Sequence, residues 1–278
     1  MIVAIENRAP IKLSTVHDFS ECFTPFEGEG PAEGNLLSRT RATVEAPSGE
    51  ILLESGNILH VRGEDGRERI AHYRGGNVDH VVDFDPSWRD VRLISKEPLL
   101  ERHEYFRLSV LYAYMQLARG LLTLHASAIR HRGEAILFAG PSGSGKSTQA
   151  RLWQEAHPGK IDILNDDKPL LDPASARAYG TPFAGTSRKS LNASAPIRAI
   201  VLVEPRSRDD ALRLGRADAA ARLYALAIRP DHDAEGMHRF FHQLEKLLDK
   251  VPIYRLCCTP TPQAVSTLKA ALEKETRQ

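Results

Sequence analysis

Residues 138–148, FAGPSGSGKST, form a glycine-rich stretch that ends in lysine, serine and threonine. Gly140, Gly145, Lys146 and Ser147 satisfy the spacing G-x-x-x-x-G-K-[ST], which indicates a phosphate-binding P-loop when a strand precedes it and a helix follows. Both conditions are met, because the apolar run AILFA lies before the loop and the helix-forming run KSTQARLWQEAH begins at its end. This context disfavours the alternative of a chance glycine turn before a helix.

The chemistry expected of such a loop is nucleotide binding. Its backbone N–H groups converge on phosphate oxygens, and the helix N-terminus adds the positive end of its dipole. The lysine reaches the β- and γ-phosphates, and the first hydroxyl after it ligates Mg²⁺. We therefore expect ATP and Mg²⁺ as cofactors. The residues expected to bind the nucleotide are Gly140, Ser142, Gly143, Ser144, Gly145, Lys146, Ser147 and Thr148.

A pair of carboxylates follows the next apolar run, in IDILNDDKP. One helical crossover separates Asp166 and Asp167 from the loop, so both elements are expected to face one site. Adjacent side chains on an extended segment point in opposite directions, so the two carboxylates cannot share one task. One can hold Mg²⁺ and the other can accept a proton from an attacking hydroxyl. The alternative is a plain polar turn, which Asn, Asp and Pro favour.

Three further groups could take part in chemistry. His125 lies on LTLHASAI, where a single histidine in an apolar run is on its own read as a core residue. The segment TPFAGTSRK is a candidate acceptor or phosphate loop, with a solvated surface loop as the alternative. His238 and His242 have the spacing of metal ligands, with His232 nearby, but the companion Glu of H-E-x-x-H is absent. Flexibility comes from Gly185 and from Gly180, which directly precedes the segment; the hydroxyls are Thr181, Thr186 and Ser187, and the cations are Arg188 and Lys189.

The elements that must position these residues change character near residue 100. Residues 1 to about 98 alternate apolar runs with turn sequences such as PSGE and GEDG, which predicts a small β-rich region. Residues 101–117 predict a helix that is apolar around most of its circumference, and Gly120 follows as a stop signal. Beyond it, strand and helix patterns alternate to the C-terminus, which predicts an α/β core.

Composition excludes several classes of protein. The net charge of +1 gives no general attraction to nucleic acid or to a membrane surface. Three cysteines, two of them adjacent, cannot form a disulfide framework, and the N-terminus lacks the pattern of a signal peptide. We therefore expect a cytoplasmic protein with neither nucleic-acid nor membrane partners.

The pattern LHASAIRHRGEAILFAGPSGSGKST…LNDDKP resembles the catalytic domain of the HPr kinase/phosphorylase family, and more broadly the phosphoenolpyruvate-carboxykinase-like P-loop fold. The resemblance covers about residues 124–205. It implies that Asp166 is the base that deprotonates the acceptor hydroxyl, that Asp167 contacts the metal, and that His125 supports the aspartate pair. Asp166, His125 and Lys146 are therefore the expected catalytic residues, and Ser147 and Asp167 are the expected metal ligands. HPr kinases phosphorylate a serine of a small carrier protein, some also catalyse phosphorolysis, and they assemble into oligomers.

The chain departs from this family after the aspartate pair, where the Glu-x-Arg-Gly signature of HPr kinases is absent. In this respect it resembles divergent, shorter HPr-kinase-like proteins, some of which occur in gene clusters for modified peptides such as lasso peptides. That resemblance implies a peptide serine or another hydroxyl as the acceptor, and it allows a homo-oligomer.

The prediction is an α/β protein with an HPr-kinase-like P-loop core, a mixed sheet and flanking helices. Residues 101–278 would form the kinase domain, and residues 1–100 a β-rich region with a role in acceptor recognition or structure. The expected function is ATP- and Mg²⁺-dependent transfer of the γ-phosphate to a hydroxyl, most simply a serine of a peptide or small protein. Three alternatives stay open: a nucleotide-binding regulatory or peptide-recognition protein with little turnover, a small-metabolite hydroxyl kinase, and a carboxykinase-type enzyme.

Overall fold

The computed structural model describes residues 1–6 and 8–275. The chain forms two compact units, each built on its own sheet, so the protein is mixed α/β. Unit 1 comprises residues 1–119 together with the segment 230–237, and unit 2 comprises residues 120–229 together with the chain from 238 onward. Within the described residues, no helix is long and apolar enough to cross a membrane.

Unit 1 contains an eight-stranded sheet with the order β1-β2-β3-β8-β7-β6-β5-β4. Strands β4 to β8 form an antiparallel meander, whereas β2, β3 and β8 run parallel to one another. Its elements are β1 (Ile2–Val3), β2 (Ile11–Ser14), α1 (Ser20–Phe23), a 3₁₀ turn η1 (Thr24–Phe26), β3 (Gly34–Thr40), β4 (Glu50–Ser55), β5 (Ile58–Arg62), β6 (Glu68–Arg74), β7 (Asn77–Phe84), β8 (Asp90–Ser95) and α2 (Glu101–Ala118).

Helix α2 matches the helix expected at residues 101–117, but it belongs to unit 1 rather than to the α/β unit that follows it. Its last turn packs on the start of β3. A Cβ atom at Gly34 would lie 2.7 Å from Arg119 Nη2 and 2.9 Å from the backbone oxygen of Arg89, so a side chain there would force these groups to shift. The division between the units therefore follows packing, at residues 119 and 120, and not the change of sequence character near residue 100.

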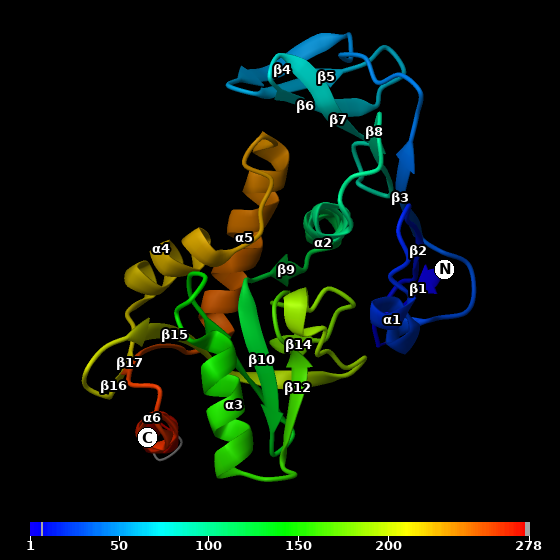
Figure 1. Cartoon of the computed structure of the whole chain (residues 1–278). Coiled ribbons are helices and arrows are strands. Elements are labelled where there is room, and N and C mark those ends of the chain that lie inside the picture. The colour runs from blue at the N-terminus through cyan, green and yellow to red at the C-terminus, as the bar shows by residue number, and fades with distance from the viewer. Residues whose placement is uncertain (7, 276–278) are drawn as a thin grey trace. The chain divides into compact units, whose positions relative to one another are not determined.

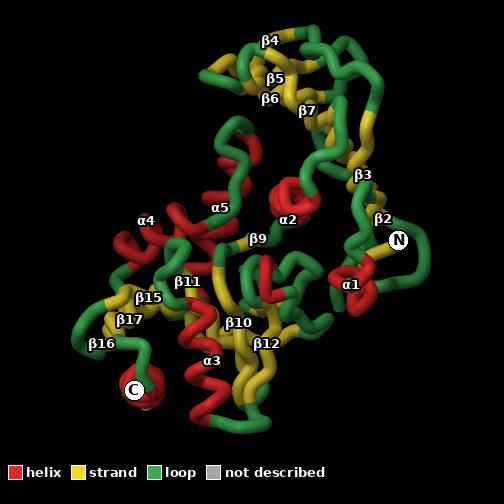
Figure 2. Tube along the Cα trace, in the orientation of Figure 1, coloured by secondary structure: helices red, strands yellow, loops and turns green. Residues whose placement is uncertain are grey.

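Unit 2 carries the alternating strands and helices that the sequence predicts, as Figure 2 shows. Its sheet has the order β12-β10-β11-β15-β14-β13-β9, and β17 pairs with both β15 and β16. Its elements are β9 (Leu122–Thr123), β10 (Ala126–His131), β11 (Glu134–Ala139), α3 (Lys146–Ala156), β12 (Ile161–Asn165), β13 (Leu170–Asp172), β14 (Arg177–Tyr179), η2 (Gly185–Ser187), β15 (Ser194–Pro205), β16 (Asp210–Arg213), α4 (Arg216–Leu226), α5 (Ala234–Lys250, whose first four residues belong to unit 1), β17 (Ile253–Cys258) and α6 (Pro262–Glu275).

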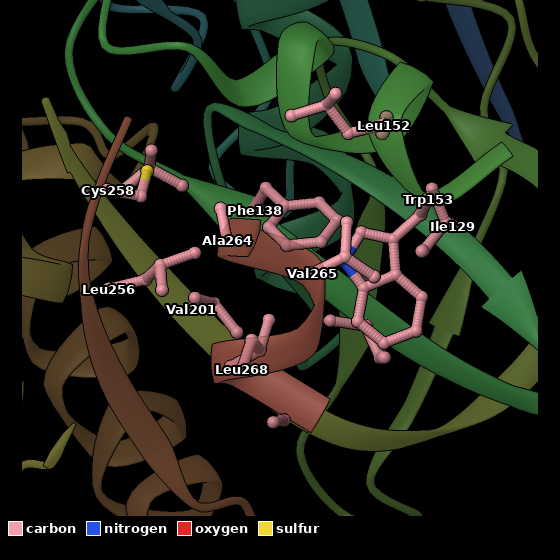
Figure 3. Packing of buried hydrophobic residues seen from close by; sticks show 14 of the residues in the cluster. Ile129, Phe138, Leu152, Trp153, Val201, Leu256, Cys258, Ala264, Val265 and Leu268 are labelled. Atoms are coloured by element: carbon pink, nitrogen blue, oxygen red, sulfur yellow. The ribbon is translucent and has the colours of Figure 1, made fainter. Parts of the chain in front are cut away.

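Helices α3 and α6 contact each other and pack on this sheet (Figure 1). Trp153 on α3 is 1% exposed and lies among Ile129, Phe138 and Val265, which come from two strands and from α6 (Figure 3). Burial of a side chain of this size contributes about 2–3 kcal/mol. The packing fixes the direction of α3, and therefore the position of the glycine-rich loop at its N-terminus.

Candidate functional site

The glycine-rich loop connects β11 to α3, as the sequence predicts. Gly145 adopts φ +95°, ψ 17° at the N-terminus of α3, a left-handed conformation that favours glycine. A Cβ atom at Gly140 would lie 2.5 Å from Ser144 Oγ and 3.2 Å from the backbone oxygen of Val203, so a side chain there would force its neighbours to shift. The geometry of the loop therefore favours glycine at both positions of the motif.

Lys146 is 8% exposed, and its ammonium group spans the loop. Nζ donates hydrogen bonds to the carbonyl oxygens of Gly140 and Pro141, at 2.9 and 3.0 Å. Burial lowers the pKa of Lys146, and the charges of Asp167 and Asp166 partly oppose that shift. The cation therefore lies within electrostatic reach of both carboxylates predicted from the sequence.

The hydroxyl groups of the loop differ in exposure. Ser142 and Ser147 are exposed and Thr148 is half-buried, whereas Ser144 is buried. Ser144 Oγ has no hydrogen-bond partner among the described residues. Buried hydroxyls are nearly always satisfied, so an unpaired one inside a loop of this shape is consistent with a ligand that supplies the missing partner.

Strand register brings the loop and the carboxylates to one edge of the sheet. Strand β10 lies between β11 and β12 and pairs antiparallel with both, so β11 and β12 run in the same direction. Ala126 pairs with Ala139, the residue before the loop, and Ala128 pairs with Asn165, the residue before the aspartates. The start of β10 consequently lies between the ends of the two strands, and His125 directly precedes it.

The two aspartates occupy a bend after β12 and have different partners. Ser127 Oγ donates a 2.7 Å hydrogen bond to Asp166 Oδ1, while His125 Nδ1 lies 2.9 Å from Asp167 Oδ1. Lys168 Nζ pairs with the other oxygen of Asp167. Among the described residues, Asp166 Oδ2 has neither a hydrogen bond nor an ion pair. The carboxylates thus differ in availability, one with a free oxygen and the other with none.

The charges around Asp167 also set it apart from Asp166. Burial raises the pKa of Asp167, but the hydrogen bond from His125 and the charge of Lys168 outweigh burial and leave this pKa below its ordinary value. Asp167 is therefore held as a carboxylate by two cation-capable side chains. It is well suited to bear negative charge and poorly suited to accept a proton.

Sequence reasoning missed Asn165, whose side chain links the aspartate bend to the loop that follows it. Its side chain is fully buried, and its Oδ1 accepts hydrogen bonds from the backbone N–H groups of Asp167 and Lys168, at 2.9 and 2.6 Å. On the other side, its amide nitrogen lies within hydrogen-bond distance of the oxygens of the following loop, namely Thr181 O, Thr181 Oγ1, Phe183 O and Ser190 Oγ. One side chain thus ties the aspartate bend to the loop at residues 181–190.

That loop contains the TPFAGTSRK segment, and it lies against Asp167. A Cβ atom at Gly185 would be 3.0 Å from Cβ and Cγ of Asp167. Thr181 is buried and donates its hydroxyl to Lys168 O at 2.9 Å, so it serves the fold rather than offering an accessible hydroxyl. Arg188 and Lys189 are exposed.

Of the histidines in the later segment, His238 and His242 on α5 line one pocket. His232 belongs to unit 1, whereas His238 and His242 belong to unit 2. In the part of the chain that the structure describes, no group of three or more His, Cys, Asp or Glu side chains is arranged to hold a metal ion.

The fold and the site together define a class: an α/β protein in which a glycine-rich strand–loop–helix and a carboxylate pair meet at one edge of a mixed sheet. A family model described as SynChlorMet cassette protein ScmC matches residues 103–273, more than half of the chain. The chain belongs to this ScmC family. A search of curated proteins found no match.

Proposed function

We propose that this protein is an ATP- and Mg²⁺-dependent kinase that transfers the γ-phosphate to a hydroxyl group. The observation that carries the proposal is the register of β10 with β11 and β12, which sets the glycine-rich loop beside the aspartate bend. Nucleotide binding alone has no need of a carboxylate with a free oxygen near the lysine of the loop. Transfer to a hydroxyl needs such a group as a base.

The loop residues fit a nucleotide. The unpaired Ser144 Oγ, the exposed end of α3 and the ammonium of Lys146 are the donor types that cradle phosphate oxygens. Ser147 and Asp167 would hold Mg²⁺, directly or through water. Two protein ligands are sufficient, because Mg²⁺ keeps several waters and is otherwise bound by substrate phosphates. When bound, the ion would neutralise charge on the phosphates.

Asp166 would act as the base. The hydrogen bond from Ser127 fixes Asp166 Oδ1, which leaves Oδ2 to accept the proton of the acceptor hydroxyl. The hydroxyl oxygen then bonds to the γ-phosphorus as the bond to the β-phosphate oxygen breaks, and ADP leaves. Lys146 offsets negative charge on the transferring group. His125 and Lys168 keep Asp167 ionised.

The resemblance to HPr kinases extends this proposal to the core fold and to the acceptor. We propose an HPr-kinase-like P-loop core in unit 2 and a serine of a peptide or small protein as acceptor. Asn165 ties the loop at residues 181–190 to the aspartate bend, and this loop would border the acceptor. A homo-oligomer is proposed by the same resemblance.

The test compares Asp166→Asn with Asp162→Asn, an exposed aspartate on β12 that pairs with Arg130 at the surface. Transfer of label from γ-labelled ATP to serine peptides, small proteins and hydroxyl metabolites is measured beside nucleotide affinity. We expect Asp166→Asn to lower transfer by about 10²–10⁴-fold and to leave nucleotide affinity within about threefold, since a general base acts only on the chemical step. Asp162→Asn should retain both.

Two outcomes would count against the proposal. Near-normal transfer by Asp166→Asn would remove the base assignment. Tight nucleotide binding, lost in Lys146→Ala, with no label on any acceptor would favour a nucleotide-binding regulatory protein with little turnover.

A further inference from the structure

Unit 1 contains a second group of chemically active side chains, on adjoining strands of its own sheet. His72 on β6 and His80 on β7 are cross-strand partners, and their rings stack at 4.4 Å with an interplanar angle of 13°. The His80 side chain is 0% exposed, and its Nδ1 lies 2.8 Å from Asp79 Oδ2. The other ring nitrogen of His80, Nε2, is buried and has no hydrogen-bond partner among the described residues.

An arginine on α2 lies within electrostatic reach of this pair. Arg107 and Tyr114 are seven residues apart and therefore lie on one face of the helix. The ring of Tyr114 is 5.7 Å from that of His232, whose charge in turn acts on His72. Arg107 acts electrostatically on both His72 and His80. In the described part of the chain, its half-buried guanidinium group has no hydrogen bond and no ion pair.

Several polar groups of this cluster lack a hydrogen-bond partner among the described residues. The guanidinium of Arg107 and the ring of His72 are half-buried and the ring of His80 is buried, and each of these groups opposes a positive charge on the others. Burial, then His80 and Arg107, lower the pKa of His72 to about 4, and burial and Arg107 also lower the pKa of His80. His232 Nε2 is a second buried nitrogen without a partner among the described residues. Buried polar atoms are nearly always paired, so the two unpaired histidine nitrogens, with a cation in electrostatic reach, point to a missing ligand.

We propose that His72, His80 and Arg107 bind a phosphate group in unit 1. The three donors come from β6, β7 and α2, so they require oxygens in different directions. A phosphate monoester offers three free oxygens in a tetrahedral arrangement, whereas a carboxylate offers two in one plane. Arginine in addition matches phosphate with its fork of donors.

Proton uptake accompanies binding at this site. The Nδ1–H of His80 is committed to Asp79, so donation from Nε2 requires the imidazolium form, and the bound dianion favours that form. The other charged or titratable groups that act on the cluster are Arg74 and Glu68 on β6, His60 on β5, Asp79 on β7, Tyr114 on α2, and Asp231 and Asp233 beside His232.

The test must report on unit 1 alone, because the glycine-rich loop of unit 2 is also expected to bind phosphate. The full-length protein is titrated with inorganic phosphate, then with phosphoserine, and the histidine Cε1–H resonances are followed by NMR between pH 4 and pH 8. We expect the apparent pKa of His72 and His80 to rise by one unit or more with either compound. Lys146→Ala should retain this response, whereas acetate at equal concentration should give a much smaller one.

Arg107→Gln should abolish the response, Arg107→Lys should weaken it, and Arg102→Gln, an exposed change on the same helix, should leave it intact. Spectra without phosphate verify that each variant is folded. Because Arg107 is an unpaired cation there, Arg107→Gln should unfold no more easily than the parent in the absence of phosphate. Three results would overturn the proposal: no shift in either pKa, an unchanged shift in Arg107→Gln, or an equal shift with acetate.

Discussion

Replacement of Asn165 by alanine should be among the most costly polar substitutions in unit 2. The change leaves the N–H groups of Asp167 and Lys168 without acceptors, and it removes the two donors shared among oxygens of the loop at residues 181–190. An unsatisfied buried polar group costs about 1–3 kcal/mol. With some relief from water entering the space, we expect a loss of about 2–4 kcal/mol, a large share of the ~5–15 kcal/mol typical of a folded domain.

The assay is urea unfolding followed by circular dichroism, with Gln263→Ala as the matched control. Gln263 is an exposed amide in the first turn of α6, and its removal should change stability by less than about 0.5 kcal/mol. A free energy of unfolding for Asn165→Ala within 1 kcal/mol of the parent would refute the reasoning, because it would mean that the hydrogen bonds around Asn165 carry little net stability.

Asn165→Asp distinguishes the hydrogen bonds that Asn165 Oδ1 accepts from those that its amide nitrogen donates. The aspartate keeps an oxygen for the N–H groups of Asp167 and Lys168, but its second oxygen faces carbonyl oxygens of Thr181 and Phe183. Those oxygens disfavour the carboxylate form and should raise the pKa of the new side chain. Its protonated form can donate one hydrogen bond. Asn165→Asp should therefore approach the stability of the parent at low pH and lose stability as the pH rises, a dependence that Asn165→Ala lacks.

Two further predictions concern a glycine and the histidines of unit 1. Gly185→Ala and Gly159→Ala should each lower the free energy of unfolding by about 1 kcal/mol, since both residues have positive φ. Only Gly185→Ala should also impair the proposed phosphoryl transfer, because its Cβ would press on Asp167, whereas a Cβ at Gly159 meets nothing within 4 Å. Burial lowers the pKa of His72 and of His232 to about 4 from 6.5. As the pH falls, the unfolded chain therefore binds a proton at each of these histidines before the folded chain does. In phosphate-free buffer the free energy of unfolding should thus be fully retained above about pH 6.5 and fall by roughly 2–3 kcal/mol per histidine towards pH 4, with a smaller fall in His72→Gln; an unchanged pH profile in that variant would contradict the assignment.

Sequence patterns were sufficient for the elements with strong periodicity. The helix expected at residues 101–117 spans Glu101–Ala118, and the strand–loop–helix around Gly140 is present. Short strands such as β13 and β16 were missed, because three or four residues carry too little pattern to separate a strand from a loop. The pairing of β10 with both neighbours was also not readable, since register depends on contacts distant in sequence.

The division into units shows the same limit. Sequence character changes near residue 100, yet α2 packs on β3 of unit 1, and the segment 230–237 joins unit 1 as well. His232 lies 5.7 Å from His60, a residue 172 positions earlier in the chain. Such a contact leaves no local trace in composition or periodicity. The cluster around His72 and Arg107 was missed for this reason.

The aspartate pair shows what the structure adds to a motif. In the sequence, Asp166 and Asp167 are equivalent carboxylates, and only the family resemblance distinguishes base from metal ligand. In the structure, Asp167 has an ion-pair partner on each oxygen, whereas Asp166 has a single hydroxyl partner and one free oxygen. A group that must accept a proton needs an available lone pair and must not be held ionised by neighbouring cations. If the proposed transfer occurs, the difference in partners therefore favours Asp166 over Asp167 as its base, independently of the resemblance that first suggested it.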